Sequence, residues 1–470
     1  MTSDKLDLIF NPNSVAVVGA SEARRKVGYL VMKSLIKGDF KGKIYPVNPK
    51  RSSVLGMEAY PSIKKIPAKI DLAVIAIPPK HIPKVMNECV EKKVPGGVII
   101  TAGFKETKSE KGIDLQNKVK KIAEKGKMMV IGPNTFGMVN IDSNLNASFT
   151  SEFSLLEKGK ISLVSQSGGV CHLAMPYALR ESIGLNKIMS LGNRLTVDFH
   201  DMIDYLAEDP NTESIALYIE GLENPKKLMD AAKEVSEEKP IVAYKAGKAE
   251  ISNQASLSHT GSLAGKYTFY KAAFRQAGII TAKNVQGLVC KADALAKQPP
   301  AKGKKVGIIT LVAGLGLISS DVCESQGLKI TKFSRKTNKK IRNLMPPLTI
   351  RSNPVDLGII ADDVDKCGKV IKTVFEDENV DCVTINYLYS WSEEFLKVPI
   401  QKIFEAYKET GKPLTVCLEY PEDIWDKYKS ELKENNIPTF STPELAAKAL
   451  AGLVKRGEIL EKHNQLNNMR

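Results

Sequence analysis

The chain has 470 residues, which at about 150 residues per domain predicts roughly three domains. Hydrophobic residues make up 43% and charged residues 26%, a globular balance that excludes collagen-like, coiled-coil and largely disordered chains. The net charge of +15 attracts anions, but aromatic residues are only 6% and no five basic residues are consecutive. Solvent-facing lysines therefore explain this charge better than nucleic-acid binding does.

Cysteine usage and the N-terminal segment predict the compartment. The seven cysteines include no CxxC pair and are odd in number, so neither a disulfide framework nor a zinc site is indicated. The first residues carry acidic side chains where a signal peptide would be basic, and no apolar stretch reaches about 18 residues. The sequence therefore predicts a cytoplasmic protein in a reducing environment, with no membrane partner.

Residues 14–104 alternate short apolar runs, bounded by Gly or Pro, with segments of helical periodicity. This alternation is typical of a parallel sheet with crossover helices. The same pattern restarts near residue 160 and again near residue 306, after a segment that contains Pro-Pro. We therefore predict an α/β protein with a Rossmann-like domain at 1–142, a second α/β domain at 143–297, a linker at 298–305, a third α/β domain at 306–458 and a frayed tail at 459–470.

The first strand ends in Gly19, Ala20 and Ser21, a turn that lacks the GxGxxG pattern. Such a turn can still bind phosphate through backbone N–H groups at a helix N-terminus. Lys50 follows the second strand, where an NAD-binding fold usually carries a carboxylate, and it suits a phosphorylated ribose instead. A turn with a purely structural role is the alternative.

A second candidate phosphate site is the run Ser165-Gln166-Ser167-Gly168-Gly169, between an apolar strand and a predicted helix. Two hydroxyls and several N–H groups would converge there at the positive end of the helix. An ordinary N-cap needs only one Ser, so the doubled Ser and Gly favour an anion site. The third domain opens with a similar strand, turn and helix around Gly314 and Gly316, although these glycines would also suit close packing alone.

His259 lies in the middle of a loop of small residues, 256–265, and is one of only five histidines. An imidazole exposed in such a loop can act as a nucleophile near neutral pH, whereas a lone histidine is more often a surface or core residue. Glu220 ends an apolar strand and could orient this ring. A solvent-facing position at the strand end explains Glu220 equally well.

Eight segments together carry a resemblance to a known family. They are VAVVGAS, the IAIPP strand end, VIITAGF, GPNTFG, SQSGG, YIEG, SHTGSLAG and NPVDLG. In this order, and over nearly the whole chain, they resemble the α subunit of ADP-forming acyl-CoA synthetases, in the superfamily of succinyl-CoA synthetase. The resemblance implies a CoA-binding Rossmann-like domain followed by two flavodoxin-like domains.

The resemblance also implies an acid–thiol ligase reaction, in which acyl-CoA and phosphate give acyl phosphate and CoA. The phosphoryl group then passes to a loop histidine and on to ADP. By resemblance, His259 is this histidine and Glu220 holds its imidazole. The phosphate-binding positions carried over are Ser165, Gln166, Ser167, Gly168, Gly169, Gly314 and Gly316, and the CoA-binding positions are Gly19, Ala20, Ser21, Lys50, Pro78, Pro79, Gly103 and Phe104.

One turn departs from the pattern of that family. The third-domain turn usually contains an Asn, two consecutive glycines and a Pro, whereas this chain has Leu311-Val312-Ala313-Gly314-Leu315-Gly316. The second phosphate contact is therefore less well supported than the first.

The sequence contains no glycine-rich strand–loop–strand pattern with metal-binding carboxylates of the ATP-grasp type. We therefore expect Mg²⁺ with ADP or ATP to bind mainly to an ATP-grasp β subunit or a fused region outside this sequence, in a hetero-oligomer. A non-catalytic CoA-sensing scaffold, related to synthetase-like regions of protein acetyltransferases, is one alternative, and an NAD-dependent dehydrogenase, disfavoured by Lys50, is the other. The acid stays open among acetate, other short or branched acids, 3-hydroxypropionate and 4-hydroxybutyrate.

Overall fold

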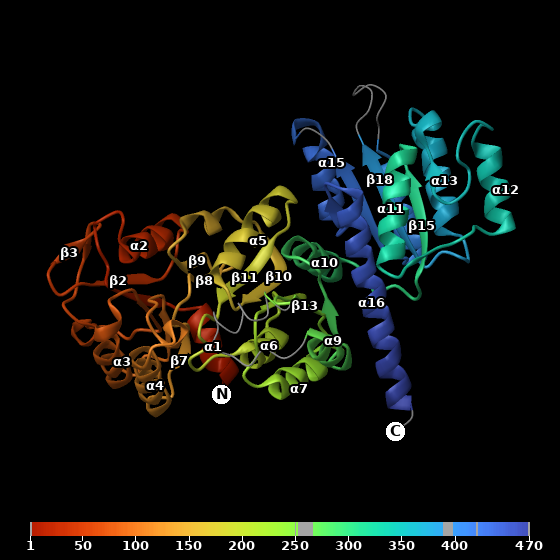
Figure 1. Ribbon diagram of the computed structural model, residues 1–470. Helices are drawn as coiled ribbons and strands as arrows, with labels where there is room; N and C mark the ends of the chain where they lie inside the picture. Colours follow the sequence, from red (N-terminus) through yellow and green to blue (C-terminus); the bar gives the residue numbers. More distant parts are fainter. Residues whose placement is uncertain (1, 250, 252–266, 389–397, 420–421, 469–470) are drawn as a thin grey trace. The chain divides into compact units, whose positions relative to one another are not determined.

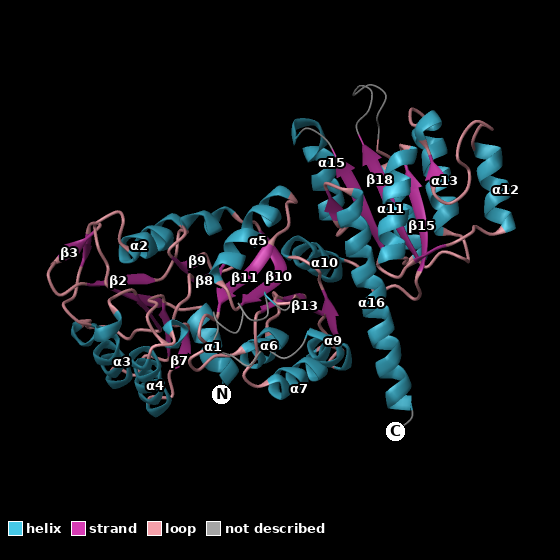
Figure 2. Ribbon diagram, viewed as in Figure 1, coloured by secondary structure: helices cyan, strands magenta, loops and turns pink. Residues whose placement is uncertain are grey.

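The computed structural model describes residues 2–249, 251, 267–388, 398–419 and 422–468. Contacts divide the chain into two compact units, Met1–Val285 and Gln286–Arg470. Figure 1 follows the chain from its red N-terminus to its blue C-terminus, and Figure 2 shows strands with helices beside them in both units.

The first unit contains two main sheets, and the N-terminal one is fully parallel, in the order β2-β1-β5-β6-β7. All residues of β1, β5 and β6 are buried, as expected for a sheet covered on both faces. This doubly wound order places ligand sites at the carboxyl ends of the strands. The elements are β1 (Ser14–Val18), α2 (Val27–Lys37), β2 (Lys43–Val47), β3 (Ser53–Val54), β4 (Met57–Glu58), β5 (Leu72–Ile75), α3 (Ile82–Glu91), β6 (Gly96–Ile99), α4 (Glu110–Lys125) and β7 (Met129–Ile131).

The second sheet has the order β14-β13-β12-β10-β11-β8-β9. Its first five strands are parallel and wound as in a flavodoxin, while β8 and β9 form an antiparallel hairpin added beside β11. Residues 137–148 thus belong to this sheet. The elements are β8 (Gly137–Asn140), β9 (Leu145–Ser148), β10 (Lys158–Ser165), α5 (Gly168–Arg180), β11 (Leu185–Ser190), α6 (Phe199–Glu208), β12 (Ser214–Ile219), α7 (Pro225–Val235), β13 (Ile241–Lys245), α9 (Tyr267–Gln276) and β14 (Ile279–Thr281).

Helix α1 (Thr2–Phe10) joins the two sheets of the first unit into one core. Leu6, Ile9 and Phe10 are fully buried, and the Phe10 ring stacks on Tyr205 of α6 with 5.2 Å between centroids. Ile9 fills the space above Gly96 at the start of β6, where an added Cβ would lie 2.1 Å from its side chain. The first unit is therefore one packed body with two adjoining sheets.

The second unit holds a parallel sheet in the order β16-β15-β18-β19-β20, with β17 paired to β15. Helix α11 packs against α16, and α13 packs against both α12 and α14. The elements are α10 (Val285–Lys297), β15 (Lys305–Thr310), α11 (Ala313–Ser325), β16 (Lys329–Ile330), α12 (Arg335–Leu344), β17 (Val355–Asp356), α13 (Val364–Phe375), β18 (Cys382–Leu388), α14 (Ile400–Thr410), β19 (Leu414–Glu419), α15 (Glu422–Glu434), β20 (Thr439–Phe440) and α16 (Pro443–Asn468).

These topologies confirm the predicted fold class, a Rossmann-like sheet followed by two flavodoxin-like sheets. One local expectation differs from the structure. Residues 459–468, expected as a frayed tail, continue α16. The physical reason is that no Pro or Gly follows Gly457, and Glu, Leu, Lys and Gln are good helix formers.

Candidate active site

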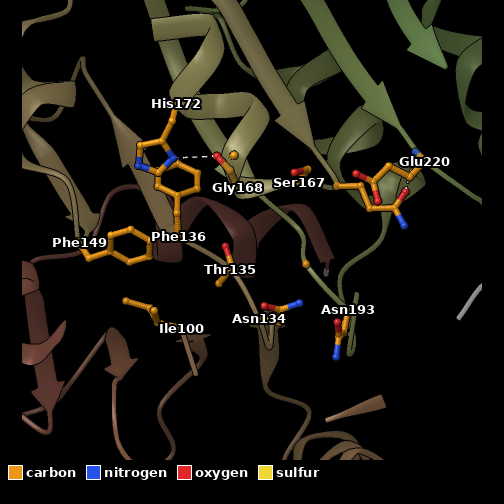
Figure 3. Close-up of a pocket in the computed structure, with 13 residues that line it drawn as sticks. Ile100, Asn134, Thr135, Phe136, Phe149, Ser167, Gly168, His172, Asn193 and Glu220 are labelled. Atoms are coloured by element: carbon orange, nitrogen blue, oxygen red, sulfur yellow. Dashed lines mark hydrogen bonds between the residues drawn. The ribbon is translucent and has the colours of Figure 1, made fainter. Parts of the chain in front are cut away.

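A cavity of about 410 Å³ lies in the first unit, beyond the carboxyl ends of β6, β10 and β12 (Figure 3). Both sheets contribute to its walls, so its position follows from the winding of the two domains and not from one motif. Its described lining residues are Ile100, Asn134, Thr135, Phe136, Phe149, Gln166, Ser167, Gly168, Gly169, His172, Gly192, Asn193 and Glu220.

The turn between β10 and α5 forms one wall of the cavity and contains the predicted phosphate-binding run. The Ser165 hydroxyl donates to the carbonyl of Ser167 at 2.7 Å and accepts the Ser167 N–H at 3.1 Å. The Ser167 side chain makes no capping bond to α5, so the first N–H groups of this 13-residue helix keep their usual need for an acceptor. Gly168 and Gly169 line the cavity at this positive helix end. The arrangement can bind an anion.

Gln166 connects this turn to Glu220. Its side chain is 5% exposed, and its Oε1 accepts the backbone N–H groups of Glu220 at 2.9 Å and Gly221 at 3.0 Å. Both Gln166 and Glu220 line the cavity (Figure 3). The structure therefore brings together the predicted phosphate site and the predicted orienting carboxylate, which lie 54 positions apart in sequence.

Two further polar residues surround Glu220. Burial, followed by the charge of the Glu220 carboxylate, raises the pKa of Tyr218. Lys245 ends β13, and its Nζ donates to the Glu220 carbonyl at 2.8 Å and lies 4.5 Å from the centroid of the Tyr270 ring. Burial lowers the pKa of Lys245 to about 8, although the Glu220 carboxylate acts in the opposite direction. A buried ammonium that loses its charge in mildly alkaline solution thus adjoins Glu220.

The predicted CoA-binding turns gather at the carboxyl edge of the first sheet. Gly19 has a φ of +94°, and a Cβ at this position would lie 2.4 Å from the carbonyl oxygen of Ala76, just beyond β5. Gly103 has a φ of +105°, and a Cβ there would lie 2.9 Å from the Pro79 side chain. Only glycine fits such close backbone approaches with positive φ. The turns after β1, β5 and β6 are therefore neighbours.

Asn48 links the first of these turns to Lys50. Its Nδ2 donates to the Ala20 carbonyl at 2.8 Å, while its Oδ1 accepts the Lys50 N–H at 2.8 Å. The Lys50 side chain is exposed, as expected for a contact to a charged ligand. Asn48 is a positioning residue that sequence reasoning missed. Exposed basic side chains beside this turn include Arg24, Arg25 and Lys26, and Arg51 forms an ion pair with Glu22 at 2.6 Å. The predicted residues Ser21 and Pro78 lie at the same edge.

The amides of Gly103 and Phe104 are already hydrogen bonded within the chain. The Glu106 carboxylate accepts the Gly103 N–H at 2.5 Å and the Phe104 N–H at 3.1 Å, and it accepts from Asn193 Nδ2 at 2.6 Å. Burial pushes the pKa of Glu106 upward, but these hydrogen bonds outweigh burial and leave the pKa below its ordinary value. Phe104 is fully buried, so any ligand contact at this turn falls to Gly103.

The third-domain turn repeats the turn before α5. The Thr310 hydroxyl donates to the Val312 carbonyl at 2.7 Å and accepts the Val312 N–H at 3.3 Å, as Ser165 does with Ser167. A Cβ at Gly314 would meet no atom within 4 Å, whereas one at Gly316 would lie 3.0 Å from the Pro354 side chain. Gly314 is therefore open at the start of α11, while Gly316 is a packing residue.

His259 lies outside the described residues, so the structure does not place it. Sequence reasoning also missed the aromatic side of the cavity, formed by Phe136, Phe149 and His172 (Figure 3). Among the described residues, no group of three or more His, Cys, Asp or Glu side chains is arranged to hold a metal ion. No helix in the described part of the chain has the length and apolar character needed to cross a bilayer.

Comparisons with known proteins agree with this arrangement of domains. Residues 13–141 match the CoA binding domain family, and residues 158–295 match the succinyl-CoA ligase like flavodoxin domain. The α subunit of ADP-forming acetate–CoA ligase II of Pyrococcus furiosus is 38% identical, over 96% of this chain and 98% of that subunit. The ADP-forming acetate–CoA ligase of Methanocaldococcus jannaschii is 39% identical, over 96% of this chain but only 63% of that protein.

A solved structure resembles the whole chain. It is a dinucleotide forming acetyl-coenzyme A synthetase 1 of Ca. Korarchaeum cryptofilum in complex with phosphate and ADP, with a TM-score of 0.86 and 32% identity. The similarity covers 97% of this chain and 98% of that one. The identity above 30% to the Pyrococcus furiosus α subunit over nearly its whole length, together with the two matched domain families, shows which family the chain belongs to. The chain therefore belongs to the family of ADP-forming acid–CoA ligases, as the portion that corresponds to their α subunits.

Proposed function

We propose that this chain carries the CoA, acyl and phosphohistidine steps of an ADP-forming acid–CoA ligase. The overall reaction interconverts acyl-CoA, phosphate and ADP with a carboxylic acid, CoA and ATP. The observation that carries the proposal is the connection of the α5 N-terminus to Glu220 through Gln166, inside one cavity. A candidate anion site and a carboxylate that line the same cavity suit phosphoryl transfer to a histidine.

In the first step, a phosphate oxygen attacks the acyl carbonyl carbon, the carbon–sulfur bond breaks, and CoA leaves as the thiol. Gly168 and Gly169 line the cavity at the start of α5. Their N–H groups would stabilise the charge of the phosphate oxygens. In the second step, an imidazole nitrogen of His259 attacks phosphorus, and the phosphorus–oxygen bond breaks to release the carboxylic acid. Glu220 holds the ring and balances the positive charge that it develops.

The exposed edge of the first sheet suits CoA. The turns at Gly19 and Gly103 would place backbone N–H groups beside a pyrophosphate, and Lys50 with Arg24 and Arg25 would pair with the phosphate groups. The turn at residues 19–21 lies in the same unit as the cavity. The thiol end of CoA would reach the cavity from this edge.

The final phosphoryl transfer to ADP needs an ATP-grasp region with Mg²⁺, and we propose that a β subunit or a fused region outside this sequence supplies it. Some relatives are separate α subunits, whereas the chain spans about two thirds of others. The purified chain should therefore bind CoA yet convert no ADP or ATP. Net synthesis of acyl-CoA by the chain at ordinary rates, with no second polypeptide detected by mass spectrometry, would contradict this proposal.

A phosphate-labelling experiment tests the central step. The chain is incubated with ³²P-phosphate and, in separate reactions, with acetyl-CoA or phenylacetyl-CoA. We expect an acid-labile, base-stable label that His259→Ala lacks and that His200→Ala, at a site on α6, retains. A label that survives His259→Ala would assign the phosphoryl group to another residue, and the absence of label with both thioesters would refute the proposed function.

A further inference from the structure

The cavity has two chemically different ends. Gln166, Ser167, Gly168 and Gly169 line the end that carries the anion site. The other end is lined by apolar and aromatic groups, and Figure 3 shows the rings of Phe136, Phe149 and His172 close together beside Gly168. An acyl phosphate has the same division, with a charged phosphate and an acyl tail. The aromatic wall is defined here as Ile100, Phe136, Phe149 and His172.

His172 contributes a wall and not a free acid or base. Its Nδ1 lies 2.8 Å from the carbonyl oxygen of Gly168, one turn earlier in α5, and its Nε2 lies 2.7 Å from the Thr150 hydroxyl. Because a carbonyl oxygen only accepts, Nδ1 carries the proton of the neutral ring, and Nε2 then accepts from Thr150. Both nitrogens are therefore engaged, and carbon atoms are left to face the cavity.

Ring contacts fix the wall in place. The Phe149 ring stacks on His172 with 5.8 Å between centroids and an interplanar angle of 21°. Phe136 and Phe153 each meet His172 at 5.3 Å in edge-to-face geometry. Phe136 is 2% exposed and Phe153 is fully buried, so neither ring can move aside without disturbing the core. The wall is preorganised before any ligand binds.

Charge excludes one class of acid from this end of the cavity. No lysine or arginine is present among the described lining residues, and the one acidic side chain among them belongs to Glu220. A dicarboxylic acid would bring its second carboxylate against Phe149 and His172 without a cationic partner, and an unpaired buried charge is strongly disfavoured. An uncharged tail meets no such penalty.

The volume of the cavity allows a tail larger than a methyl group. A cavity of about 410 Å³ equals the liquid volume of roughly 14 water molecules, so a longer acyl tail fits beside the phosphate. Each additional CH₂ that reaches the aromatic wall should raise kcat/KM by roughly fourfold through burial alone.

We propose that the aromatic wall is the acyl-tail site, and that Phe149 and His172 select monocarboxylic acids with an uncharged, apolar tail larger than a methyl group. This inference rests on the proposed function, because it assumes that the α5 N-terminus holds the phosphate of the acyl phosphate.

The test uses the chain together with its ATP-grasp partner and follows thiol release from four thioesters with phosphate. We expect kcat/KM to be at least tenfold higher for 3-methylbutyryl-CoA and phenylacetyl-CoA than for acetyl-CoA, and at least 100-fold lower for succinyl-CoA than for phenylacetyl-CoA. Equal or better use of acetyl-CoA, or use of succinyl-CoA at a rate comparable to phenylacetyl-CoA, would overturn the inference and leave the proposed function intact. No thiol release with any thioester would instead count against the proposed function.

Variants of Phe149 and His172 test whether the aromatic wall causes the preference for larger acyl tails. Phe149→Ala should lower the ratio of phenylacetyl-CoA to acetyl-CoA kcat/KM at least tenfold, and the milder Phe149→Leu should lower it less. His172→Leu restores an apolar surface and should keep this ratio within threefold of the parent, whereas His172→Ala should lower it. A folded His172→Leu protein that binds CoA but releases no thiol would show that His172 acts in proton transfer, and an unchanged ratio in Phe149→Ala would remove Phe149 from the tail site.

Discussion

Gln166 Oε1 accepts the backbone N–H of Glu220 at 2.9 Å. Gln166, which follows Ser165 in the turn before α5, therefore also holds the backbone that carries the Glu220 side chain. Gln166→Met keeps the length of the side chain but removes the acceptor, which leaves the amides of Glu220 and Gly221 buried without this partner. We expect a loss of about 1–3 kcal/mol in the free energy of unfolding. We also expect slower labelling of His259, with CoA affinity unchanged.

Urea denaturation, ³²P labelling and calorimetric CoA titration measure these three effects. Gln401→Met, on the exposed face of α14, is the matched control for the substitution itself. Labelling at the parental rate in Gln166→Met would show that the position of Glu220 does not depend on Gln166.

Glu220→Gln should slow phosphoryl transfer by roughly 10²–10⁴-fold, because the neutral amide no longer balances the charge of the reacting imidazole. CoA binding should persist, since the candidate CoA contacts lie at the edge of the first sheet. Rapid-quench labelling measures the rate. Glu213→Gln, at the exposed residue before β12, removes a carboxylate at the opposite end of the same strand and should label normally. Turnover of Glu220→Gln within threefold of the parent would make Glu220 a bystander.

Lys105 and Glu223 form an ion pair of 2.5 Å between the loop after β6 and the loop after β12, which carries Glu220. Burial alone would raise the pKa of Glu223. The hydrogen bond and the charge of Lys105 outweigh burial, so the pKa of Glu223 lies below its ordinary value. The Glu223 side chain is 48% exposed, and solvent screening therefore limits the pair to roughly 0.5–1 kcal/mol. A double-mutant cycle with Lys105→Met and Glu223→Gln should give this coupling in 10 mM salt and less in 1 M salt. Additive effects of the two substitutions at low salt would rule the pair out as a link between the loops.

Asp209 is a buried carboxylate whose charge stabilises the first unit. Lys187 Nζ lies 2.7 Å from its Oδ2, and the two side chains are 2% and 7% exposed. Burial raises the pKa of Asp209, but hydrogen bonds from Lys187 and Thr212 outweigh burial and lower the pKa overall. A carboxyl group with a lowered folded-state pKa stabilises the protein above its unfolded-state pKa of about 4, and this stabilisation is lost as pH falls through the folded-state pKa.

Asp209→Asn should therefore destabilise the first unit by about 3–5 kcal/mol at pH 7, because it leaves Lys187 buried and unpaired. It should also reduce the fall in stability below about pH 4. Denaturation midpoints between pH 3 and pH 7 measure both effects, and Asp230→Asn on the exposed face of α7 serves as control. An equal loss of stability at pH 3 and pH 7 would contradict the assignment.

The parallel α/β class could be predicted from sequence because short apolar runs, many of them bounded by Gly or Pro, alternate with segments of helical periodicity. The β8–β9 hairpin was harder to assign, because β8 pairs with residues of β11 that lie about 50 positions later in the sequence. The turn at Gly103 was predicted as a ligand contact, but sequence gave no sign that Glu106 accepts its amides. His172 and Phe149 have no local motif, because their role depends on ring packing between α5 and the segment after β9.

The paired turns at Ser165 and Thr310 change how the two flavodoxin-like domains should be compared. In each, the last residue of the first strand closes a small ring through its hydroxyl, so the backbone path into the following helix is set before any glycine is reached. The glycines of the two turns are spaced differently, at positions 168 and 169 in one and at 314 and 316 in the other. A hydroxyl residue stands at the end of the strand in both turns. A Ser or Thr three residues before the first helical residue is therefore the feature that the two turns share.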